Sequence, residues 1–120
     1  MTAAKDIGRL TALANLILDS QLVQVQQAAA AKRDSELQIQ GLASPARPAA
    51  GVADIAAELA ALAYQRWADA RRSDLNLILA RQTSAWLDAR DAARLAFGRS
   101  QALRGIAENL DAARASKQRQ

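Results

Sequence analysis

The chain has 120 residues, no cysteine, no histidine and a formal net charge of +4. These absences exclude disulfides, thiol nucleophiles, histidine acid–base chemistry and zinc sites built from His or Cys ligands. The hydrophobic content of 51% includes 31 alanines, so about a quarter of the chain is large and apolar. That amount favours a narrow seam between helices over a compact globule.

The first predicted element is a helix over residues 3–40. Thr2 can cap it, and no proline occurs before Pro45. Its apolar spacing changes along the way, which predicts a local stutter in the seam. The residues that define the two parts of this seam are Ile7, Leu10, Ala14 and Ile17, followed by Leu18, Leu22, Val25 and Ala29.

A loop is predicted over residues 41–53. Pro45 and Pro48 each push the preceding residue out of the helical region. Gly41 fits a helix C-terminal cap and Gly51 fits a turn. Asp54 then offers an N-cap for the next helix.

The second predicted helix runs over about residues 54–115, with a frayed tail at 116–120. Its register is disturbed across Arg71–Asp74, and a regular 3-4 spacing begins at Leu75. The predicted seam reads Leu75, Leu79, Gln82, Trp86, Ala89, Ala93, Ala96, Ser100, Leu103, Ala107, Leu110 and Arg114. The fold class that follows is all-α, a long antiparallel two-helix coiled-coil hairpin with unequal arms, in one elongated domain over 1–120.

The pairing register follows from where the chain reverses. If the loop centre lies near residue 47, opposite residues have numbers that sum to about 94. This predicts Ile39 opposite Ile55, Gly8 opposite Trp86, and the Ala28–Ala31 run opposite Tyr64 and Trp67. The longer arm then overshoots the shorter by about 27 residues, or about 40 Å. Residues from about 92 onward would have no partner within the chain and would need one from outside.

The sequence predicts no enzyme, no cofactor and no metal site. It contains no phosphate-binding loop, no Gly-x-Ser-x-Gly motif and few carboxylate pairs on one helix face. A two-helix rod has no pocket in which such a pair would acquire a shifted pKa. The arginines ring the second helix and do not line one side of it, which favours a solvated surface over a nucleic-acid interface.

The charge is uneven and the location is predicted to be cytoplasmic. Residues 1–60 carry 5 basic and 6 acidic groups, whereas residues 61–120 carry 11 and 6. A basic half fits an acidic protein, a nucleic acid or an anionic membrane surface. No stretch has the length and purity of a transmembrane helix, and the N-terminus does not open as a signal peptide.

Three segments give the chain a family likeness: Trp86–Arg94, Leu110–Arg114 and Tyr64–Trp67. With two helical arms of unequal length, the chain resembles the FliJ family of flagellar export proteins and its type III secretion stalk relatives. The resemblance implies a coiled-coil adaptor or stalk of the export apparatus, located in the cytoplasm and peripheral to a membrane-bound machine. It implies two partners, the hexameric export ATPase and the export gate.

The partner-binding residues follow from the hairpin geometry under that resemblance. The gate would contact the region around Tyr64 and Trp67, and the ATPase would contact the free end together with Ile7. The residues predicted at the free end are Arg90, Arg94, Leu95, Leu103, Arg104, Ile106 and Leu110. An alternative stays open: a homodimeric helical bundle with a structural or chaperone-like role. Non-specific nucleic-acid binding is a third hypothesis.

Overall fold

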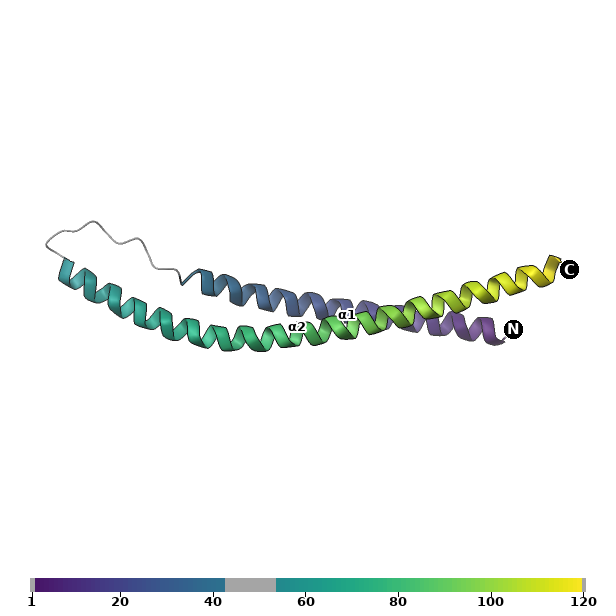
Figure 1. Ribbon diagram of the computed structural model, residues 1–120, viewed down its shortest axis with the longest axis horizontal. Helices are drawn as coiled ribbons and strands as arrows, with labels where there is room; N and C mark the ends of the chain where they lie inside the picture. Colours follow the sequence, from purple (N-terminus) through teal and green to yellow (C-terminus); the bar gives the residue numbers. More distant parts are fainter. Residues whose placement is uncertain (1, 43–53, 120) are drawn as a thin grey trace. The chain divides into compact units, whose positions relative to one another are not determined.

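The computed structural model describes residues 2–42 and 54–119, and these residues form two helices. Helix α1 spans Thr2–Gln40 and helix α2 spans Asp54–Arg119 (Figure 1). The predicted all-α hairpin with unequal arms is therefore confirmed, with arms of 39 and 66 residues. The predictions for Pro45, Pro48 and Gly51 lie outside the described residues.

The helix ends differ from the predictions in two ways. The Gly41 N–H donates to the Leu37 carbonyl oxygen at 2.9 Å, and the Leu42 N–H donates to that of Ile39 at 3.1 Å. Because no described glycine has a positive φ, Gly41 does not form the predicted left-handed cap. Helix α2 continues to Arg119, beyond the predicted helix end at about residue 115. Lys117 and Arg119 in its last turn complement the negative end of the helix dipole.

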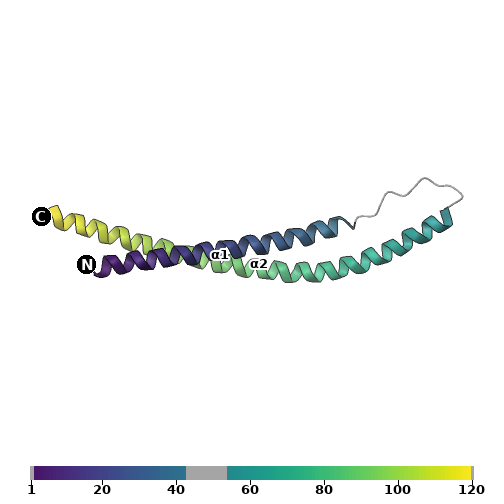
Figure 2. The same cartoon turned by 180° about the vertical axis from the view of Figure 1, so that it is seen from behind.

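The described residues group into two compact units. Unit 1 comprises Met1–Ala28 and Trp86–Gln120, and unit 2 comprises Ala29–Ala85. In unit 1 the first turns of α1 and the last turns of α2 lie at the same end, as Figures 1 and 2 both show. The two segments of unit 1 are therefore antiparallel. That the whole chain forms one domain stays a prediction.

The buried face of α1 keeps one regular spacing, so the predicted stutter is wrong. Leu10, Ile17 and Leu22, three residues of the predicted seam, are exposed. Buried and half-buried side chains recur instead at alternating intervals of three and four residues. They are Ala4, Ile7, Thr11, Ala14, Leu18, Gln21, Val25, Ala28, Lys32, Ser35, Ile39 and, just beyond the helix, Leu42. Asn15, Ala29 and Glu36, each next to one of these positions, are also half-buried. The side chains that face α2 are thus mainly small or polar.

The seam of α2 agrees closely with the prediction. Of the twelve predicted positions from Leu75 to Arg114, eleven are buried or half-buried, and Arg114 alone is exposed. Before Leu75, the covered positions are Tyr64, Ala68 and Arg72, spaced by four residues each. This break in the 3-4 spacing is the disturbance predicted around Arg71–Asp74.

The core is thin because its buried residues are small. The buried apolar side chains are Ala14, Leu42, Ala68, Leu75, Ala93 and Ala96, and the buried polar ones are Ser35 and Ser100. Small side chains allow two helices to approach closely. They also bury little apolar surface, so each larger buried side chain carries a large share of the hydrophobic stabilisation.

Candidate partner-binding surfaces

The register of unit 1 is fixed by a polar pair in its seam. The buried Ser100 hydroxyl lies 2.7 Å from the Asn15 side-chain oxygen Oδ1 and donates to it. Residues at the same level of this unit therefore have numbers that sum to about 115, and not to about 94. The predicted pairing of Gly8 with Trp86 is wrong, and a Cβ added to Gly8 would meet nothing within 4 Å.

Unit 2 has a similar register, set by Ser35 and Gln82. The buried Ser35 hydroxyl donates to Gln82 Oε1 at 2.5 Å. Nearer the end of α1, Leu42 packs with Ala68 and Leu75 in the cluster that also contacts Ile39 and Tyr64. As the α1 residue number rises, its partner's number falls, so this unit is antiparallel too.

Two predicted contacts in unit 2 are consequently wrong. Tyr64 packs against the Leu42 cluster and does not face the alanine run of α1. Ile39 belongs to the same cluster, whereas its predicted partner Ile55 is 76% exposed. The prediction assumed that the chain reverses symmetrically about residue 47. The pairing instead begins at Tyr64 and Ala68, about ten residues into α2.

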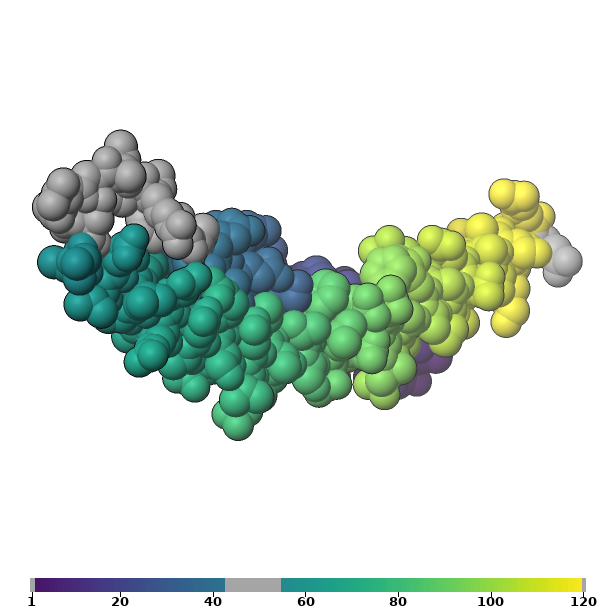
Figure 3. All heavy atoms as spheres, turned by 60° about the vertical axis from the view of Figure 1, so that its left-hand side comes forward, coloured from purple at the N-terminus to yellow at the C-terminus, as the bar shows by residue number. Residues whose placement is uncertain are grey.

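The uncovered parts of α2 are its two ends, residues 55–63 and residues 111–119. Every residue from 55 to 63 is exposed, and side chains of these first turns, in teal, stand on the molecular surface in Figure 3. Ile55, Leu59 and Leu62 follow the i, i+4, i+7 pattern of one helix face. We call these three residues the entry stripe.

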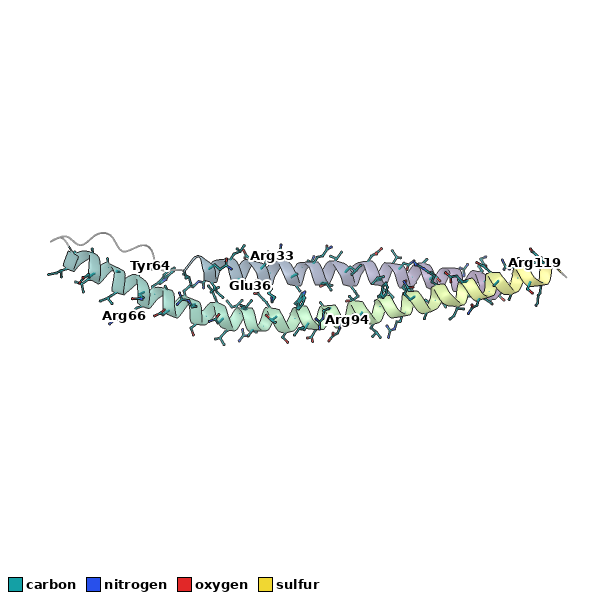
Figure 4. The ribbon with its side chains drawn as sticks, turned by 45° about the horizontal axis from the view of Figure 1, so that its top comes forward. Arg33, Glu36, Tyr64, Arg66, Arg94 and Arg119 are labelled. Atoms are coloured by element: carbon teal, nitrogen blue, oxygen red, sulfur yellow. The ribbon has the colours of Figure 1, made fainter. Side chains whose placement is uncertain are left out.

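Two aromatic residues follow the entry stripe and differ in exposure. The Tyr64 ring is half-buried and lies 5.7 Å from the Trp67 ring, with the two planes at 43°. Trp67 is 56% exposed. Tyr64 and Arg66 point to opposite sides of α2 in Figure 4. Of the two predicted aromatic anchors, Trp67 presents a free ring face and Tyr64 serves mainly in packing.

The prediction that α2 has no partner within the chain from about residue 92 onward is wrong as far as residue 110, whereas residues 111–119 are all exposed. Leu103 and Leu110 are half-buried positions of the unit 1 seam, and Ile7 is half-buried in the facing helix. The other predicted residues of this region, Arg94, Leu95, Arg104 and Ile106, are exposed. The predicted site is thus divided between the seam and the surface.

Arg90 is engaged within the chain. Its guanidinium carbon lies 5.3 Å from the Trp86 ring centroid, which is cation–π geometry. Its Nε lies 4.0 Å from Asp91 Oδ1 and is buried, with no hydrogen-bond partner among the described residues. These contacts hold Arg90 along α2 and do not direct it outward to a partner.

A second surface was missed by the sequence reasoning. In unit 1 a shallow groove of about 370 Å³ runs between the helices, and Arg99 is its one charged lining residue. The groove is lined by Leu10, Leu13, Ala14, Ile17, Ala96, Arg99, Ala102 and Leu103. The 3-4 spacing of Leu10, Leu13 and Ile17 indicates this groove, but hydrophobicity alone favours Leu10 and Ile17 for the seam with α2.

The remaining candidate sites among residues 2–42 and 54–119 are few. No cluster of three or more acidic residues is placed to hold a metal ion in this part of the chain. None of the helical stretches there is both long enough and apolar enough to cross a lipid bilayer.

Two apolar surfaces described above could contact a partner. They are the entry stripe on unit 2 and the groove between the helices of unit 1. Comparison with protein-family models, with curated proteins and with solved structures found no match to this chain.

Proposed function

We propose that this chain is a non-enzymatic helical adaptor of the flagellar or type III export apparatus, which binds the export ATPase and the export gate. The resemblance to the FliJ family supports the export apparatus as the location. It is carried by the segments Trp86–Arg94, Leu110–Arg114 and Tyr64–Trp67. The two-helix hairpin supports it by presenting large apolar side chains to solvent on both units.

The observation that carries the proposal is the uncovered start of α2. Ile55 is 76% exposed and Leu59 is 62% exposed, and neither belongs to the cluster of buried side chains around Leu42. Fully burying one Leu or Ile contributes about 1.5–3 kcal/mol. With the exposed Trp67 a little further along α2, the entry stripe has the composition of a binding hot spot.

The two partners take different surfaces in this proposal. The entry stripe and Trp67 bind the export gate, as the predicted gate contact near Tyr64 and Trp67 requires. The ATPase contact falls to Arg94, Arg104 and their exposed apolar neighbours. Leu103 and Leu110 support that surface from the seam and do not touch the partner.

Retention of purified partners tests the proposal. The full chain, immobilised through a tag, is expected to retain the export ATPase and the cytoplasmic domain of the export gate of its own host. The double substitution Leu59→Glu and Leu62→Glu is expected to weaken gate binding at least tenfold, because two charges would enter an apolar contact. ATPase binding is expected to stay unchanged in this variant.

Ala57→Glu provides the matched control. Ala57 is exposed on the same turns of α2 but about 160–220° around the helix from the entry stripe. This variant adds the same kind of charge and is expected to bind both partners as the natural chain does. Failure of the natural chain to retain either partner would refute the proposed function.

A further inference from the structure

Each unit has a side-chain hydrogen bond between its two helices. In unit 1 the buried Ser100 hydroxyl donates to Asn15 Oδ1, and in unit 2 the buried Ser35 hydroxyl donates to Gln82 Oε1. The two acceptor residues, Asn15 and Gln82, are half-buried. Such a bond forms only where donor and acceptor lie at matching levels of the two helices, so it distinguishes one register from another.

The apolar part of the seam distinguishes registers poorly. Because its spacing repeats every seven residues, a shift of one helix by seven residues keeps the two seam faces in contact. Leu42 contacts both Ala68 and Leu75, which are themselves seven residues apart, so one such shift keeps Leu42 on Leu75. The other buried apolar side chains among the described residues are alanines, which have little shape to match: Ala14, Ala68, Ala93 and Ala96.

The length of the segment between the helices does not select the register either. Leu42 packs with Ala68, which lies 14 residues, or about 21 Å, beyond the start of α2 at Asp54. A shift by seven residues would change this separation to about 11 Å or about 32 Å. A chain of eleven residues, the length of the segment 43–53, spans at most about 36–40 Å and reaches both.

A shift by seven residues would break both hydrogen bonds. The residues that would replace the present partners are apolar: Leu75 or Ala89 opposite Ser35, and Ala93 or Ala107 opposite Asn15. A buried polar group that loses its partner in this way destabilises the shifted register. Ser100 would approach Gln21 in one of the shifted registers, so Ser35 and Gln82 form the more selective pair.

We propose that the Asn15–Ser100 and Ser35–Gln82 hydrogen bonds select the register of the two helices against registers shifted by seven residues. The apolar layers hold the helices together but do not make this choice. Buried polar groups have this role in coiled coils, where they specify register and contribute little to stability. The inference requires only the chain's own two helices, so it is independent of the export function proposed above.

Moving the α2 partner of each pair by seven residues tests the proposal. The exchanged variant carries Gln82→Ala with Ala89→Gln and Ser100→Ala with Ala107→Ser, which leaves the amino-acid composition unchanged. Its new partners match Ser35 and Asn15 only when α1 shifts by seven residues, or about 10 Å, along α2. We expect this shift, because it restores both hydrogen bonds and keeps Leu42 on Leu75.

The distance between two nitroxide labels measures the register. The labels are attached at Ser20→Cys and Gln101→Cys, two exposed positions in a chain without other cysteines. Residue numbers at one level of unit 1 sum to about 115, so these positions lie about six residues, or about 9 Å, apart along the helix axis. In the shifted register this offset falls to about 1.5 Å. Pulsed electron paramagnetic resonance, with excess unlabelled chain to remove distances between molecules, should give one distance for the natural chain and a shorter one for the exchanged variant.

The matched control makes the same kind of exchange outside the seam. It carries Ser73→Ala with Ala80→Ser and Ala102→Asn with Asn109→Ala, all at exposed positions seven residues apart. Its label distance is expected to equal that of the natural chain. The natural distance in the exchanged variant would overturn the proposal.

A second variant removes both hydrogen bonds and keeps the side-chain volumes similar. It carries Asn15→Leu, Ser35→Ala, Gln82→Leu and Ser100→Ala. We expect it to keep its helicity by circular dichroism and to show more than one label distance, because registers seven residues apart become similar in stability. The natural distance alone would mean that the apolar layers set the register, even if the exchanged variant does not fold. A loss of helicity would show that the apolar layers do not hold the helices together, and either result would overturn the proposal.

Discussion

Leu75→Glu is expected to separate the two helices of unit 2. Leu75 is 3% exposed, and among the described residues only it and Leu42 are both large and buried. Removal of a buried leucine side chain alone costs about 2–5 kcal/mol. A buried carboxylate adds a desolvation penalty. The basic side chain nearby, Arg72, already donates to Asp69 at 2.9 Å and to the Leu42 carbonyl oxygen at 3.4 Å. We expect a loss of at least about 3 kcal/mol, measured as a lower Tm by circular dichroism.

The control for this prediction is Leu77→Glu. Leu77 lies two residues further along α2 and is 62% exposed. It receives the same substitution in the same helix, so differences in helix propensity cancel. Its effect is expected to stay within about 0.5 kcal/mol. Equal losses of Tm in the two variants would mean that Leu75 is not a seam residue.

Ser100→Glu is expected to disrupt unit 1. The Ser100 side chain is 2% exposed and donates its hydroxyl to Asn15. A glutamate there is larger than the space between the helices and brings a charge to it. Overpacking costs about 1–3 kcal/mol, and the unpaired buried charge costs more. Tm and the helicity at 25 °C should both fall.

Gln101→Glu is the neighbouring control. Gln101 is exposed on α2, so a carboxylate at this position remains in water. Its Tm is expected to match that of the natural chain, since surface changes are usually small. If unit 1 had the register in which residues beyond about 92 are unpaired, Ser100→Glu would be as harmless as Gln101→Glu.

The sequence predicted the seam of α2 well for a physical reason. From Leu75 to Leu110 the 3-4 spacing is regular, and few alternative spacings fit the same residues. The helix boundaries could be predicted equally well from the sequence. Prolines and glycines occur only near the ends of the helical stretches, except for Gly8, Gly98 and Gly105. Local chemistry determines both features.

The seam of α1 and the pairing register of the two helices could not be predicted from the sequence in the same way. Hydrophobicity favoured Leu10 and Ile17 for the seam, whereas the structure places Thr11 and Leu18 there and leaves Leu10 and Ile17 at the surface. In a seam of alanines and serines, close approach of the helices counts for as much as side-chain hydrophobicity. The register depends on pairs such as Ser100 with Asn15, which are distant in sequence.

The surfaces of unit 1 depend on its helix register, which an engineered disulfide tests directly. The chain contains no cysteine, so two introduced cysteines can pair only with each other. Asn15→Cys with Ser100→Cys is expected to form an intramolecular disulfide under mild oxidation at submicromolar concentration, because the side chains at these two positions meet across the seam. Gly8→Cys with Trp86→Cys is expected to keep both thiols free, as measured by thiol titration and intact mass. Rapid oxidation of the Gly8–Trp86 pair with free thiols at positions 15 and 100 would contradict the register and the surfaces derived from it.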